Sequence, residues 1–263
     1  MTPKWSVVDG IQTLWEKVAG DLKDVRLNVN ISKISRGRFF NTIKFKLTDQ
    51  TGFWGTRTRS ITCGKIIIAF PQIASKMSFL DMDNEELAIF SRVKTEQYFS
   101  SAVFTPGFAN PSKRYLGYAR ASPMNDGHLK RAEKPYGIGE PQLIFSQNFL
   151  FSTIYSWASE GIRAPIDVVK SLILKDTAGL SGLTLNQDSI KDFNVWDYFP
   201  HFGTNDIVNG IYKKLDELQG HRDTYYIGSL FLFESVEATI QSTKDIFNRH
   251  FAKKSTEMAK FVE

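Results

Sequence analysis

The sequence predicts a mixed α/β fold in which regular elements at both ends enclose an irregular, aromatic middle. Residues 1–75 and 200–263 combine amphipathic helical segments with short strand-like segments, whereas residues 76–199 contain long loop-rich and aromatic stretches. A domain interrupted by an insertion has this order. In a chain of 263 residues, we therefore expect 1–75 and 200–263 to pack together and 76–199 to form a second, inserted domain.

The N-terminal part predicts one helix over residues 9–20 and three strands. Asp9 can cap the helix and Gly20 can end it. One helical face carries the apolar residues at i, i+3, i+4 and i+7, which are Ile11, Leu14, Trp15 and Val18. The predicted strands are Val25–Ile34 and Ile43–Leu47, which alternate, and Lys65–Phe70, which is continuously apolar. We expect all three strands in one neighbourhood, with the first two paired as a hairpin.

The middle contains elements separated by loops. Loops are expected over 106–142, and turns dominate 179–194. The elements expected here are a helix capped by Asn84, a strand at Tyr98–Thr105, a β-prone aromatic run at Phe145–Trp157 and a helix opened by Pro165.

The C-terminal part is regular again. Asn205 can cap one helix that ends at Gly220, with Ile207, Val208, Ile211, Leu215 and Leu218 inward. A short strand at Asp223–Ile227 and a turn at 228–234 follow, and Ser235 can cap a last helix.

Composition and motifs exclude several classes of function. The net charge is +5, but the basic residues are scattered among 28 acidic ones, which predicts no nucleic-acid binding. Cys63 is the single cysteine and is expected as a buried structural thiol; the four histidines stand apart, so no metal site is predicted. With no membrane-spanning run and no apolar leader at its start, the chain is expected to be soluble and cytoplasmic.

Three stretches resemble the flavin amine-oxidase superfamily, most closely a fungal type that tailors secondary metabolites. The first is Asp9–Trp15 followed by Val25–Ile34, similar to a helix and a following strand whose backbone flanks the adenine of FAD, with Ile31 at the adenine-contacting position. The second is Lys65–Pro71, similar to "K-L-I-I-A-x-P". The third is Asp223–Ser229 with Glu234–Ala238, similar to the C-terminal flavin motif.

The resemblance implies FAD as cofactor and a remnant of a Rossmann-like FAD-binding domain with an inserted mixed-sheet substrate domain. Gly228 and Ser229 would lie near the pyrophosphate, and the backbone at Val236 would face the flavin's pyrimidine carbonyl. The chemistry agrees, since a glycine after a strand admits an anion closely and a helix N-terminus attracts it. Tyr155, Trp157 and Tyr198 are the predicted substrate contacts, because each joins a ring to a polar group; the alternative is that these rings only line a core. No catalytic residue is predicted.

One departure from the family pattern matters most. The N-terminal GxGxxG turn of such enzymes does not occur in the sequence; the GxG at Gly137–Gly139 runs into Glu140 and Pro141. The chain is therefore expected to be a truncated relative that by itself binds FAD weakly or not at all. We expect it to need an N-terminal complementing chain or to form a homodimer.

Three functions stay open at this stage. The first is an FAD-dependent oxidoreductase, or part of one, that oxidises a small hydrophobic metabolite. The second is a flavin-free binding protein, tailoring cyclase or accessory subunit that uses the retained substrate domain. The third is a remnant without a function.

Overall fold

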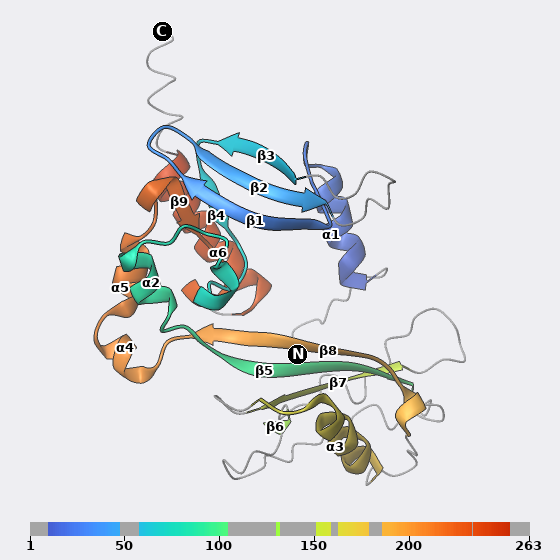
Figure 1. The fold of residues 1–263 in the computed structure, drawn as a ribbon. Helices are drawn as coiled ribbons and strands as arrows, with labels where there is room; N and C mark the ends of the chain where they lie inside the picture. Colours follow the sequence, from blue (N-terminus) through green and yellow to red (C-terminus); the bar gives the residue numbers. More distant parts are fainter. Residues whose placement is uncertain are drawn as a thin grey trace, which may run out of the picture. The chain divides into compact units, whose positions relative to one another are not determined.

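The computed structural model describes residues 10–47, 58–104, 130–131, 151–158, 163–178, 186–232 and 234–252. The chain divides into two compact units, which Figure 1 shows with their labelled elements. The first unit holds residues 1–66 and 78–82, and the second holds 67–77 and 83–263. The division of 76–199 from 1–75 and 200–263 as an inserted domain stays a prediction.

The first unit contains a helix and a three-stranded antiparallel sheet with the order β1-β2-β3. The predicted helix and hairpin are both confirmed, because β1 pairs with β2 and places Ile34 opposite Ile43. The expected strand at residue 25 begins later, since Asn28 has a left-handed backbone (φ 53°) that interrupts the extended chain. The elements are α1 (Gly10–Gly20), β1 (Val29–Arg36), β2 (Asn41–Leu47) and β3 (Thr58–Cys63).

A short returning segment closes this unit. The backbone N–H of Ile34 donates to the carbonyl of Phe79 at 2.6 Å. The buried Arg36 donates through Nε to Oδ1 of Asp81 at 2.7 Å, and its backbone N–H donates to Oδ2 at 2.8 Å. Residues 78–82 are thereby joined to β1 by backbone hydrogen bonds and by an ion pair. Cys63, expected as buried, is only half-buried at the end of β3, and its partial burial raises the pKa of the thiol.

A two-stranded sheet joins β4 (Ile66–Ile68) to β9 (Thr224–Tyr226). The sequence correctly places a strand within Lys65–Phe70, but it pairs with β9 rather than with the predicted hairpin. Ile66 and Ile68 are buried, as are all three residues of β9. An apolar strand of this kind needs a partner that is itself buried, and β9 supplies it.

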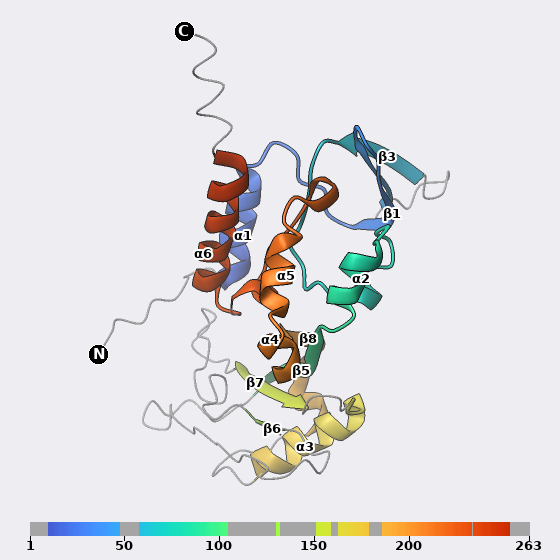
Figure 2. The same ribbon diagram turned by 90° about the vertical axis from the view of Figure 1, so that its left-hand side faces the viewer.

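The largest sheet has four antiparallel strands in the order β6-β7-β5-β8. Residues 190–194, predicted as turn, belong to β8, because β5 offers a long edge on which Ile190 pairs opposite Val103. Helix α3 lies along this sheet in Figure 2, and its Val169 and Ile173 are buried. The elements are β5 (Lys94–Phe104), β6 (Lys130–Arg131), β7 (Phe151–Ala158), α3 (Ile166–Ala178) and β8 (Ile190–His201).

Two of the remaining helices begin or break differently from the expectation. Helix α2 (Asn84–Phe90) is capped by Asp83 rather than Asn84, with a capping box completed by Glu86. The single helix predicted from Asn205 is two, α4 (Thr204–Val208) and α5 (Ile211–Glu217), because Gly210 adopts a left-handed conformation (φ 72°) between them. The break leaves Ile207 and Val208 exposed, while Ile211, Leu215 and Leu218 are buried as predicted.

Helix α6 (Val236–Phe247) begins as predicted. Ser235 caps it by accepting the backbone N–H of Ala238 on its Oγ at 3.0 Å. Short 3₁₀ turns precede it at η4 (His221–Asp223) and η5 (Ser229–Phe231). No helix among the described residues is long and apolar enough to cross a membrane.

Candidate functional site

One face of the four-stranded sheet gathers aromatic residues. In the antiparallel register Tyr98 pairs with Trp157 on one side and Trp196 on the other, and Ser100 pairs with Tyr155. Residues opposite each other in adjacent strands share a face of the sheet, and residues two apart share it too. The three predicted substrate contacts, Tyr155, Trp157 and Tyr198, are therefore placed on one face by the register.

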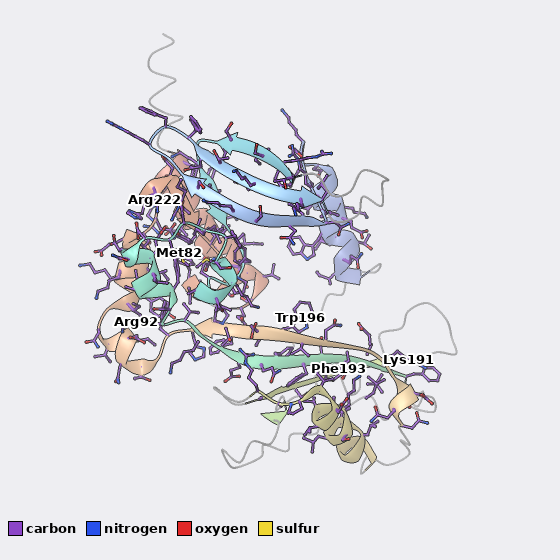
Figure 3. The ribbon with its side chains drawn as sticks, in the orientation of Figure 1. Met82, Arg92, Lys191, Phe193, Trp196 and Arg222 are labelled. Carbon is purple, nitrogen blue, oxygen red and sulfur yellow. The ribbon has the colours of Figure 1, made fainter. Side chains whose placement is uncertain are left out.

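The opposite face of this sheet is core. Phe99 and Val103 are fully buried there, and Phe193 contacts both the Phe99 ring (5.8 Å between centroids) and the Lys170 ammonium group (5.2 Å) of α3. Figure 3 shows Phe193 on the α3 side of β8 and Trp196 on the other side. One face thus packs on the helix, and Trp196 and Tyr198 of the other face are exposed.

The aromatic side chains on the open face are held by specific contacts. Tyr98 and Tyr198 stack with ring centroids 4.5 Å apart, and the indole Nε1 of Trp196 donates to Oγ of Ser100 at 3.1 Å. Trp196 is nevertheless 55% exposed and Tyr198 39% exposed. Rings that are fixed in position but open to solvent suit the binding of an apolar molecule.

A titratable cluster lies at the end of this face. Glu234, in the segment before α6, accepts the backbone N–H of Phe199 on Oε1 at 2.7 Å, and its Oε2 is buried without a well-formed hydrogen bond. Burial raises the pKa of Glu234, an effect that Glu96 reinforces and that Tyr198 and His201 oppose. Burial, together with the neighbouring Glu234 carboxylate, raises the pKa of Tyr198 to about 12.

The second feature is the turn that follows β9. Gly228 has φ 121° and ψ −166°, a conformation that only glycine adopts without strain, and a Cβ there would lie 3.4 Å from the carbonyl oxygen of Ala69. The fully buried Gln72 donates through Nε2 to the carbonyls of Ile68, Phe70 and Ile227. This amide binds the end of β4 to the residue that precedes Gly228.

The helix after the turn presents free donors. By helix geometry the N–H groups of Val236 and Glu237 have no intrahelical acceptor. Val236 is exposed, and so is Ser235 at the cap. Ser229, the first residue of η5, is half-buried. Gly228, Ser229 and Val236 thus belong to one continuous segment whose backbone suits an anion.

Ile31, the predicted adenine contact, lies in β1 of the first unit, half-buried and opposite Phe45. It is followed by a register shift that disturbs the pairing before Lys33. The structure thus gathers Gly228, Ser229 and Val236 in the second unit and places Ile31 in the first. Among the described residues no group of histidine, cysteine and carboxylate side chains could hold a metal ion.

Sequence reasoning missed two residues of this region, Gln72 and Glu234, as site candidates. Gln72 follows Pro71 in a quoted motif, and Glu234 directly precedes the cap Ser235. The signal for each was only its position beside a motif, because the partners of both side chains lie far away in the sequence.

Comparison with known proteins supports a flavin-dependent class. No protein-family model matches the chain. An uncharacterised protein of Acanthamoeba polyphaga mimivirus is 25% identical over 240 residues, which covers 89% of this chain and 47% of that protein. A protein of Cochliobolus heterostrophus named FAD-dependent oxidoreductase is 23% identical over 223 residues, covering 83% of this chain and 44% of that protein.

The fold is similar to that of two solved structures. The fatty acid isomerase from P. acnes that produces CLA has a TM-score of 0.70 and 22% identity, covering 94% of this chain and 53% of that chain. A protein from Exiguobacterium assigned as a protoporphyrinogen oxidase has a TM-score of 0.56 and 15% identity, covering 93% and 51%.

The fold is thus the mixed α/β fold of FAD-dependent oxidases, and the homologues with names are FAD-dependent oxidoreductases. The chain spans about half the length of the relatives that it matches.

Proposed function

We propose that the chain is part of an FAD-dependent oxidoreductase of the amine-oxidase type that oxidises a small hydrophobic metabolite. The observation that carries this proposal is the Gly228 turn, where a glycine-only backbone conformation leads directly into a capped helix. The names of the fungal relatives support FAD as the cofactor. We extend this to secondary-metabolite tailoring on the resemblance of the motifs alone.

The residues present fit a flavin nucleotide at this turn. A backbone without a Cβ at Gly228 and free N–H groups at the start of α6 are what a pyrophosphate or a polarised carbonyl requires. Gly228, Ser229 and the backbone of Val236, which all belong to the second unit, would hold the group. When bound, FAD supplies a two-electron acceptor for a substrate C–H bond.

The chain's own residues supply binding and orientation. The stacked Tyr98 and Tyr198 and the exposed Trp196 form a surface that an apolar substrate can cover, and covering it removes water from the site. We assign Tyr155 and Trp157 to the same substrate surface on their register in β7. A fatty acid is one such apolar substrate, as the name of the P. acnes isomerase indicates for that protein.

A flavin-free binding or accessory protein is the second candidate. It is favoured by one observation, the fixed but exposed rings of Trp196 and Tyr198, which can bind an apolar molecule without a cofactor. Such a protein would use the aromatic face to hold a hydrophobic molecule without oxidising it.

Flavin titration separates the two candidates. The purified chain is titrated with FAD, alone and together with a polypeptide that supplies a GxGxxG turn, while flavin fluorescence and melting temperature are followed. For the oxidoreductase we expect at least one of these combinations to form a yellow complex whose melting temperature rises with FAD. Failure of every combination to bind flavin would favour the second candidate.

A further inference from the structure

A carboxylate bonds the end of strand β8 to the segment between the Gly228 turn and α6. Oε1 of Glu234 accepts the backbone N–H of Phe199 at 2.7 Å, across 35 positions in the sequence. The backbone of Phe199 is left-handed (φ 52°), an unusual conformation for an aromatic residue. The hydrogen bond therefore holds a residue of unusual backbone conformation at the edge of the aromatic face.

The strand is irregular at the same place. Glu96 of β5 pairs with Tyr198, but Lys94 pairs with His201, so β8 carries one extra residue between these pairs. An extra residue re-aims the side chains beside it. The orientation of the Tyr198 side chain therefore depends on the contacts that fix the irregular backbone of β8. Glu234, which lies outside this sheet, makes one such contact with Phe199.

The charges around Glu234 come from two strands. Glu96 of β5 repels its carboxylate, and His201 of β8 attracts it. The Tyr198 hydroxyl is close enough to the carboxylate to interact with it, and Tyr198 is itself stacked on Tyr98. Glu234 thus contacts the chain on both sides of the β8 irregularity.

We propose that Glu234 is a positioning residue, which fixes Tyr198 and Phe199 of the aromatic face relative to the turn at Gly228. The inference rests on the proposed function, because it assigns the aromatic face to the substrate and the turn to the cofactor. Glu234 lies six positions after Gly228 and directly before the cap of α6. Glu234 thus joins the end of β8 to the segment that leads from the turn into α6.

The ionisation of Tyr198 tests this directly. Tyrosine labelled with ¹³C at Cζ is incorporated, and the Tyr198 signal is assigned with Tyr198→Phe. In the unmodified chain this signal should titrate with a pKa of about 12. In Glu234→Gln its midpoint should move down, because the carboxylate no longer raises the pKa, but it should stay above the ordinary value of about 10, because the burial of Tyr198 remains. The Phe199 amide resonance should keep its hydrogen-bonded position, because the Gln carbonyl can still accept.

The matched control is Glu237→Gln, which removes an exposed carboxylate from the first turn of the nearby helix α6. It should leave the Tyr198 midpoint unchanged, and far-ultraviolet circular dichroism at the same pH checks that each variant is folded. Equal Tyr198 midpoints in Glu234→Gln and Glu237→Gln would overturn the proposal. If Glu234→Gln does not fold, Tyr198→Phe provides the reciprocal test. The chemical shift of the Phe199 amide reports the protonation of Glu234, and Tyr198→Phe should change the pH midpoint of that protonation. An unchanged midpoint would overturn the proposal.

The flavin titration is read separately from this result. If no flavin binds in any combination, the proposed function fails while the Tyr198 titration still reports the contact. If flavin binds but Tyr198 titrates alike in both variants, the positioning role fails and the oxidoreductase proposal stands.

Discussion

The hydroxyl of Tyr226 donates to Oε1 of Glu86 at 2.6 Å, and both side chains are fully buried. This bond ties β9 to α2, where the Tyr226 ring also contacts Phe90 with centroids 4.8 Å apart. On the other side, the Gln219 amide bonds both the N–H and the carbonyl of Tyr226, at 3.0 and 2.8 Å. The strand that leads into the Gly228 turn is therefore fixed by side chains from two directions, and the position of the turn follows from them.

The Tyr226 hydroxyl should make a measurable contribution to the free energy of unfolding. Tyr226→Phe keeps the ring but leaves a buried carboxylate oxygen without this donor, which costs about 1–3 kcal/mol. Urea unfolding followed by tryptophan fluorescence measures the loss. Tyr212→Phe is the control, because the Tyr212 side chain is exposed. Equal effects of the two substitutions would show that the hydrogen bond between Tyr226 and Glu86 adds nothing to the free energy of unfolding.

Substitution of the turn glycine should affect both stability and flavin binding. Gly228→Ala forces an L side chain to adopt φ 121° close to the Ala69 carbonyl, and strain of this kind costs about 1–3 kcal/mol. The thermal midpoint should fall, and any FAD affinity of the complemented protein should fall with it. Gly64→Ala, at a position with open space and no positive φ, should change neither quantity. A Gly228→Ala protein that binds FAD as tightly as the parent would remove the turn from the cofactor site.

Asp197 should make stability depend on acid pH. Lys76 and Arg163 contact its carboxylate at 2.5 and 2.7 Å, and the hydrogen bond from Lys76 above all lowers the pKa of Asp197. A carboxyl group whose pKa is lower in the folded chain stabilises that chain above its unfolded pKa, near 3.8, and loses this contribution as pH falls through the folded value.

Asp197→Asn should therefore cost about 0.5–1 kcal/mol at neutral pH, since both cationic partners are largely exposed. The difference from the parent should disappear at strongly acidic pH. Urea unfolding at a series of pH values measures it, with the exposed Asp188→Asn as control. A difference that persists at the lowest pH would show that packing, not charge, is responsible.

Part of the candidate site follows from short-range sequence signals. The sequence predicts three of its residues, because each depends on neighbours within a few positions. They are Gly228 after a strand, Ser235 as a helix cap and Val236 at the helix start. Two aromatic residues of the face, Tyr155 and Trp157, were also visible in the β-prone run at Phe145–Trp157. The division of the sheet into a face that packs on α3 and an open face with Trp196 required the register between β5 and β8.

The sequence by itself determined the local elements of this protein: the first helix, the β1–β2 hairpin and the capped last helix. Their periodicity, turns and caps act within one element or between neighbours along the chain. Only the tertiary structure decided that Ile66–Ile68 pairs with Thr224–Tyr226, that β8 extends back to Ile190, and that Glu234 bonds Phe199. These contacts join residues that lie far apart in the chain. The packing of the whole unit, rather than any local preference, decides which strand edges and which buried polar groups meet.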